Sequence, residues 1–186
     1  QAIDIEAIKK KVMRGLSEPA GIITFPGVNG YTKDLDKRLP YDVNAAKQLL
    51  ADAGYPNGFD VELRCPNDRY VNDEAICTAV VGMLGKIGVN VNLFAQTKSK
   101  HFKELKDNQG DFYMLGWGVP TLDSHYVFHY LYESGASWNK VNFSNSEVDA
   151  AIRVMEGEVD LDKRNAAIAN AWKIVKDDIS YLPLHH

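Results

Sequence analysis

The sequence predicts an α/β fold: a mostly parallel sheet flanked by helices, with a βαβαβ core and C-terminal helices. Segments typical of strands lie at residues 59–64, 89–95 and 112–115, and stretches with the helical period separate them. Each connection is long enough to hold a helix, which favours neighbouring parallel strands joined by right-handed crossovers. No internal repeat or flexible linker interrupts the chain, so we expect a single domain over residues 1–186.

The composition is that of a globular domain. Hydrophobic residues make up 45% of the chain and charged residues 25%, which leaves enough apolar surface to form a core. The net charge is −4, and Lys9–Lys11 is the longest basic run, so we expect no nucleic-acid partner. No segment approaches the roughly 20 apolar residues that a bilayer requires. Gln1 and Ala2 lead into a helical pattern without a cap, which is typical of a chain cut inside an element.

The first well-defined helix and strand lie between residues 42 and 66. Asp42 is expected to cap a helix that continues to Ala53 and ends at Gly54. From Phe59 to Arg64 apolar and polar residues alternate, which predicts a strand with one buried face that ends before Pro66.

The next elements complete the predicted βαβαβ core. The clearest helical stripe runs from Val71 to Ile87 and stops at Gly88. Residues 89–95 alternate as a second strand, and a short amphipathic helix with Phe102 and Leu105 leads to the third strand.

Helices follow the core. One is expected from Ser124 to Tyr132, and another begins at the capping-box pair Ser144 and Glu147 and ends near Gly157. The apolar stripe of a long final helix contains Ile168, Trp172, Val175 and Ile179. Residues 181–184 surround a proline and suit an edge or departing strand.

The chain has two cysteines, Cys65 and Cys77. They can form a disulfide in an oxidising compartment, or they can be two buried thiols that pack as small apolar residues. The thiols are the favoured alternative because free cysteines are often buried, but the distance between the Cα atoms decides the matter.

A ligand site is expected at one edge of the sheet. Ligands of open parallel sheets bind beyond the carboxyl ends of the strands, and three loops lie there: 65–70, 96–100 and 116–123. If the strands are adjacent, these loops form one rim. The candidate ligand-binding residues are Asn67, Arg69, Tyr70, Gln96, Trp117 and Asp123.

Each of the more informative candidates has a structural alternative. Trp117, between two glycines, offers a stacking face or plugs the core with its indole N–H bonded to backbone. Asp123 is a helix N-cap candidate first and a ligand contact second. Arg69 and Tyr70 can hold a carboxylate between a guanidinium fork and an aromatic wall, or Arg69 is a solvated loop residue.

No catalytic, metal or cofactor site is expected. Asp123, Ser124 and His125 have the residue types of a hydrolase triad, but adjacent helix positions point in different directions. His125 and His129 share a helix face, as two zinc ligands do, yet the sequence shows no third ligand, so half-exposed histidines are favoured. His185 and His186 are either native or part of a purification tag.

Several motifs resemble one known family across nearly the whole chain. The most specific is the Tyr-Asp pair at 41–42 followed by Gly-Tyr-Pro-Asn-Gly-Phe at 54–59, and the others are residues 2–15, 86–89, 111–117 and 181–184. With these motifs the chain resembles the bacterial extracellular solute-binding proteins of family 5, the peptide, oligopeptide and nickel class.

The resemblance implies a periplasmic-binding-protein-like lobe. Members of the family close two lobes around a ligand, and this stretch looks like the carboxyl-side lobe without its partner. They lie in the periplasm or outside the membrane, including as tethered lipoproteins, and deliver a small-molecule or peptide ligand to an ABC permease in the membrane. We therefore expect a receptor lobe and not an enzyme, and a monomer; the alternative is the ligand-sensing module of a transcription regulator.

The resemblance also carries over to individual residues. Trp117 looks like the aromatic residue of the family's Gly-Trp loop, and Arg69 resembles a basic loop residue that holds a ligand carboxylate. The acid that often follows three residues after the tryptophan and receives a peptide ammonium falls on Pro120 here. This departure leaves Asp123 as the nearest substitute and puts ordinary peptide binding in doubt.

Overall fold

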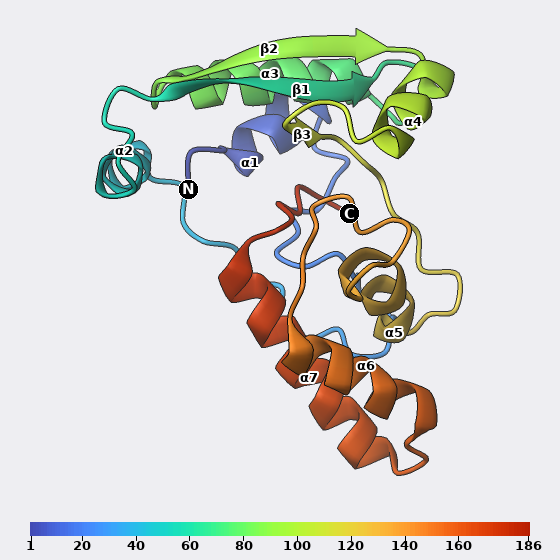
Figure 1. Cartoon of the computed structure of the whole chain (residues 1–186). Coiled ribbons are helices and arrows are strands. Elements are labelled where there is room, and N and C mark those ends of the chain that lie inside the picture. Colours follow the sequence, from blue (N-terminus) through green and yellow to red (C-terminus); the bar gives the residue numbers. More distant parts are fainter. The chain divides into compact units, whose positions relative to one another are not determined.

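The computed structural model describes residues 1–186, which divide into two compact units (Figure 1). Unit 1 comprises residues 1–19 and 39–116, and unit 2 comprises residues 20–38 and 117–186. The single lobe expected from the sequence therefore stays a prediction, and each unit is described by itself.

Unit 1 contains a three-stranded sheet in the order β2-β1-β3 (Figure 1). The strands are β1 (Phe59–Pro66), β2 (Val89–Gln96) and β3 (Phe112–Tyr113), and both pairings are parallel. The βαβαβ order and the parallel sheet predicted from the sequence are confirmed. β3 is shorter than the predicted run 112–115, although the N–H of Met114 still donates to the carbonyl of Arg64 at 2.9 Å.

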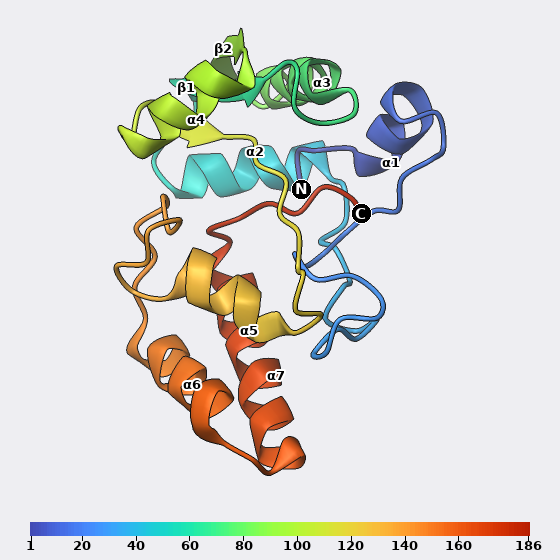
Figure 2. The same cartoon turned by 90° about the vertical axis from the view of Figure 1, so that its right-hand side faces the viewer.

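Helices α3 (Asp73–Gly85) and α4 (Lys98–Lys106) lie on opposite faces of the sheet (Figure 2). Successive β1 residues alternate between these faces, so Leu63 is buried toward α3 while Arg64 reaches α4. The buried face of α3 is made by Ile76, Cys77, Val80 and Met83. The sequence wrongly included Val71 in this stripe, since it precedes the helix and is 72% exposed.

The remaining helices of unit 1 are α1 (Ile5–Ala7), which continues as the π-helical turn η1 (Ile8–Val12), and α2 (Val43–Asp52). Asp42 caps α2 as predicted. The prediction of an uncapped first helix is wrong, because the carboxylate of Asp4 accepts the N–H of Ala7 at 2.9 Å.

Unit 2 is helical. It contains α5 (Ser124–Val127), continued by the π-helical turn η2 (Phe128–Tyr132), and the neighbouring helices α6 (Ser146–Gly157) and α7 (Leu161–Asp178) (Figure 2). The core side chains that these helices bury include Val127, Phe128, Leu131, Val148, Ile152, Ile168 and Trp172. None of the chain's helices has the length and apolar character that crossing a membrane requires.

Three details of unit 2 differ from the sequence predictions. The cap of α6 is Asn145, whose side chain accepts the N–H groups of Glu147 and Val148, whereas the hydroxyl of Ser144 lies 3.1 Å from that of Ser134. Ile179 follows α7 in the left-handed region, with φ 60°, and is half exposed instead of extending the apolar stripe. Residues 181–184 form no strand.

Candidate functional site

The parallel strands bring their trailing segments to one edge of the unit 1 sheet. The N–H of Asn67, after β1, donates to the carbonyl of Gln96 at the end of β2, at 2.9 Å. The hydroxyl of Tyr70 donates to the carbonyl of Gly116, after β3, at 3.3 Å. Within unit 1 the loops after β1 and β2 and Gly116, after β3, therefore meet, whereas residues 117–123 of the third predicted loop belong to unit 2.

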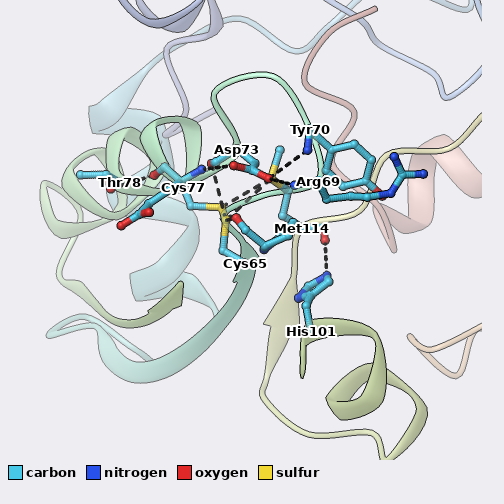
Figure 3. The surroundings of a disulfide bond; sticks show 10 residues. Cys65, Arg69, Tyr70, Asp73, Cys77, Thr78, His101 and Met114 are labelled. Atoms are coloured by element: carbon cyan, nitrogen blue, oxygen red, sulfur yellow. Dashed lines mark hydrogen bonds between the residues drawn. A yellow bond between two sulfur atoms is a disulfide. The ribbon is translucent and has the colours of Figure 1, made fainter. Parts of the chain in front are cut away.

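The loop between β1 and α3 is closed by a disulfide between Cys65 and Cys77 (Figure 3). The Cα atoms are 6.6 Å apart, within the range that such a bond spans. The preference for two free thiols is therefore wrong. Met114 Sδ packs 3.8 Å and 3.6 Å from the two sulfur atoms, which places the segment after β3 against the disulfide.

Asp73, in the first turn of α3, fixes the backbone of the same loop (Figure 3). Its Oδ2 accepts the N–H groups of Arg69 and Tyr70, both at 2.9 Å, and its Oδ1 accepts the N–H of Glu74. The side chain is almost fully buried, so these bonds to a charged acceptor compensate for its desolvation. Asp73 was not among the residues predicted from the sequence, although an acid in the first turn of the strongest helix, directly after the loop, is the signal for such a role.

Arg69 and Tyr70 are presented together by this loop. Arg69 is exposed, and its guanidinium carbon lies 5.0 Å from the centroid of the Tyr70 ring, within the range of a cation–π contact. Figure 3 shows the two side chains next to each other. Gly116 allows the ring to lie there, because a Cβ at that position would come within 2.6 Å of it.

Gln96 lies at the same sheet edge, but its side chain is buried in a polar network. Its Nε2 donates to Glu104 Oε2 at 2.7 Å, and Glu104 also pairs with Arg64 at 3.3 Å. The guanidinium of Arg64 in turn covers the ring of Phe94 at 3.9 Å. Burial by itself would raise the pKa of Glu104, but the hydrogen bond from Gln96 and the charges of Arg64 and Lys100 outweigh it and lower the pKa. The network holds α4 against β1 and β2.

His101 on α4 holds the segment after β3 (Figure 3). Its Nε2 lies 3.0 Å from the carbonyl oxygen of Met114, and because a carbonyl only accepts, the imidazole donates. Burial lowers the pKa of His101, although the hydrogen bond to Met114 acts in the opposite direction. A neutral, buried imidazole thus anchors the segment that leads to Gly116.

Trp117 lies in unit 2, in an aromatic cluster. Its ring centroid is 6.0 Å from those of Tyr126 and Tyr130 and 5.9 Å from that of Trp138. The indole is half buried against the helical core, but its Nε1 has no hydrogen-bond partner. Trp117 thus packs as a core plug does, without the backbone hydrogen bond that this alternative included.

Asp123, also in unit 2, caps α5 as predicted: its Oδ1 accepts the N–H of His125 at 2.9 Å. Both of its oxygens also accept from Arg164, at 2.8 and 2.9 Å, and Asn29 Nδ2 donates to Oδ2 at 3.0 Å. Burial would raise the pKa of Asp123, but these hydrogen bonds outweigh it and lower the pKa. Arg164 and Asn29 come from distant parts of the chain, and no local pattern pointed to them.

Ser124 has its own buried partners. Its hydroxyl donates to the carbonyl of Asn29 at 2.6 Å and accepts the indole N–H of Trp172 at 3.1 Å. The hydroxyl is therefore bonded to groups other than His125, in agreement with the rejection of a triad on geometry.

The six predicted residues fall into two sets: Asn67, Arg69, Tyr70 and Gln96 in unit 1, and Trp117 and Asp123 in unit 2. The first set surrounds the carboxyl edge of the sheet, with Gln96 buried and Arg69 and Asn67 exposed. The second set shares the segment that leads into α5.

Comparison with known proteins relates this chain to a family of transport receptors. The chain is 28% identical over 193 residues to heme-binding protein A of Haemophilus influenzae, covering 100% of this chain and 35% of that protein. It is 26% identical to the dipeptide-binding protein of Escherichia coli, covering 100% of this chain and 36% of the relative. The chain thus spans about a third of the length of these curated relatives.

Solved structures show the same fold. The dipeptide-binding protein of Pseudoalteromonas sp. SM9913 in complex with Met-Leu matches with a TM-score of 0.88 and 25% identity, over 100% of this chain and 38% of that one. HbpA2 from Haemophilus parasuis matches with a TM-score of 0.90 and 23% identity, over 100% and 37%. The sequence profile of the bacterial extracellular solute-binding proteins, family 5 (Middle), matches residues 1–139. This chain belongs to family 5 of the bacterial extracellular solute-binding proteins.

Proposed function

We propose that this chain is the ligand-binding lobe of a longer receptor that delivers a small acidic ligand to an ABC permease in the membrane. The observation that carries the proposal is the loop of Arg69 and Tyr70, which is held by Asp73 and a disulfide at the carboxyl edge of a parallel sheet. Ligands of this fold class bind at that edge. The other side of the cleft would come from the part of the receptor that relatives carry and this chain lacks.

The ligand class follows from Arg69. An exposed guanidinium on a fixed backbone suits a carboxylate, which accepts two parallel hydrogen bonds from it. The names of the relatives include heme, dipeptide and glutathione as ligands, and all three carry carboxylates. We propose that Tyr70 forms the wall of the same subsite and that Asn67, also exposed, hydrogen-bonds the ligand there.

The remaining predicted residues support the site in different ways. We propose that Trp117, held in place by the rings of Tyr126, Tyr130 and Trp138, offers the exposed part of its indole for a stacking contact. Gln96 positions the loop after β2, because its side chain is bound to Glu104. Asp123 already accepts from Arg164 and Asn29, so we propose that it positions the Trp117 segment and does not receive a ligand ammonium.

The receptor would lie in the periplasm or outside the membrane, including as a tethered lipoprotein, and would be a monomer. It uses no catalytic step: binding exchanges water around a polar ligand for hydrogen bonds from two lobes that close by a hinge. The disulfide agrees with an oxidising compartment.

The experiment that tests this proposal uses the full-length receptor. Native mass spectrometry identifies the retained ligand, and calorimetry then compares wild type with Arg69→Ala and with the charge-matched control Lys47→Ala on exposed α2. Because Arg69→Ala removes a charge-assisted hydrogen bond, we expect it to weaken binding by about tenfold or more. The affinity of the control should be unchanged. Equal affinities for all three proteins, or a retained ligand without an acidic group, would contradict the proposal.

A further inference from the structure

Two histidines and a glutamate meet on unit 2, and none of the three is used above for ligand binding. His125 on α5 and His129 on η2 are one helical turn apart, with their rings stacked at 5.6 Å and 22°. Glu156 on α6 joins them, and one ligand atom of each side chain lies within 4.8 Å of the other two. The sequence showed no third ligand because Glu156 comes from a different helix.

A second layer of charged side chains orients this cluster. Glu133 Oε2 lies 2.7 Å from His129 Nδ1, and Glu156 Oε1 lies 3.6 Å from His125 Nε2. Arg153 binds the other oxygen of each carboxylate, Oε1 of Glu133 and Oε2 of Glu156. Each carboxylate thus has one oxygen next to Arg153 and the other next to a histidine.

This arrangement is typical of the surroundings of a bound metal ion. A carboxylate beside one ring nitrogen keeps the proton there and leaves the other nitrogen with a free electron pair, as in carboxylate–histidine–metal groups. Glu133 is close enough for this role at His129, since its Oε2 lies 2.7 Å from Nδ1, and a proton at Nδ1 would leave Nε2 to bind a metal.

The charge and exposure of the cluster also suit a cation. Two carboxylates and one guanidinium give a net charge of about −1 when both imidazoles are neutral. The side chains of His125, His129 and Glu156 are 30%, 42% and 34% exposed, so an ion reaches them from solvent without unfolding the helices.

We propose that His125, His129 and Glu156 bind a divalent transition-metal ion such as Zn²⁺, with Glu133 as the outer partner of His129. Two imidazoles and one carboxylate match zinc and its neighbours, and water would complete a four-coordinate site. This ligand set disfavours Ca²⁺ and Mg²⁺, because these ions prefer to be bound by oxygen atoms alone. Metal–ligand bonds of about 2.1 Å require the three ligand atoms to lie closer together than they do without the ion, and rotation of the side chains would bring them there.

The test is a calorimetric titration of the chelator-treated chain with Zn²⁺. It uses a background with His185→Ala and His186→Ala, because this second histidine pair, with His186 Nε2 3.7 Å from Asp36 Oδ1, can bind metal on its own. We expect one Zn²⁺ per chain in this background and no heat with Ca²⁺. His129→Ala and Glu156→Gln should each weaken binding by about tenfold or more, whereas Glu147→Gln, an exposed glutamate at the other end of α6, should leave it unchanged.

Circular dichroism and the melting temperature without metal show whether each variant is folded, and all the substituted side chains are at least partly exposed. Zinc should raise the melting temperature of the background protein and of Glu147→Gln, but not of the His125→Ala/His129→Ala double variant. Zinc binding of equal strength in that double variant, or no zinc binding in the background protein, would overturn the proposal. The ligand affinity of Arg69 variants does not enter the test, so the two proposals fail independently.

Discussion

The guanidinium of Arg164 binds both carboxylate oxygens of Asp123, at 2.8 and 2.9 Å. This pair connects the first turn of α7 to the cap of α5, and therefore fixes the segment that carries Trp117. Asp123 is thus committed to the structure of unit 2.

The pair predicts a pH dependence of stability. Hydrogen bonds outweigh burial and lower the pKa of folded Asp123 below its usual 3.8. Its contribution is therefore complete above about pH 5 and is lost as the pH falls through the folded pKa, because the unfolded chain binds the proton first. The difference in unfolding free energy between wild type and Arg164→Met, from urea denaturation, should be largest at pH 6 and shrink toward pH 3. A difference that is constant over this range would contradict the assignment.

Asp73 should control the order of the Arg69 loop. Asp73→Asn keeps the side-chain volume but removes one acceptor and the charge that binds the N–H groups of Arg69 and Tyr70. We expect a loss of about 1–3 kcal/mol in unfolding free energy and faster hydrogen exchange of these two amides. The exposed Asp107→Asn is the matched control. Unchanged exchange in Asp73→Asn would mean that the disulfide alone holds the loop.

The disulfide should stabilise the folded chain by reducing the conformational entropy of the unfolded chain. Cys65 and Cys77 are separated by 12 positions, and closing a loop of this length contributes about 3 kcal/mol in the chain-entropy estimate. A reducing agent should therefore lower the midpoint of urea unfolding in the wild type and have no effect on Cys65→Ala/Cys77→Ala. Equal stability of the wild type with and without reductant would show that the bond contributes little.

Two glycines should respond to alanine in opposite directions. Gly82 is exposed in α3 with no atom within 4 Å of an added Cβ, so Gly82→Ala should raise the unfolding free energy by about 0.5–1 kcal/mol. Gly58 has φ +73°, and a Cβ there would come within 1.8 Å of the Gly88 carbonyl oxygen. Gly58→Ala should destabilise unit 1 by more than about 1 kcal/mol. Thermal unfolding of both variants checks this prediction. If both substitutions changed the stability in the same direction, the backbone described at one of the two glycines would be wrong.

The sequence predicted the core of the fold because the periodicities there are local. The alternation in Phe59–Arg64 and the stripe of α3 each follow from burial of one face, and the parallel sheet then follows from the long connections. The first and last residues of the helices were less predictable. Asn145 and Ser144 are both good caps, and only the packed structure selects between them.

The sequence indicated which loops lie at the carboxyl edge of the sheet, but not the side chains that hold the candidate residues in place. Arg69 and Tyr70 were predicted as candidates because a loop after a strand is where ligands bind in this fold class, and their ligand contact stays a prediction. Arg164 on Asp123, and Glu156 beside the two histidines, are contacts between elements far apart in the sequence. Gln96 was placed on the correct edge, but its burial depends on Glu104 of the following helix.

The most direct test of the account is a calorimetric comparison of the isolated 186-residue chain with the full-length receptor, using the ligand found by native mass spectrometry. We predict that the chain folds alone but binds this ligand at least about a hundredfold more weakly, because half of the enclosing contacts are missing. Binding by the isolated chain as tight as that of the full-length receptor would show that this lobe is the whole site and would contradict the account.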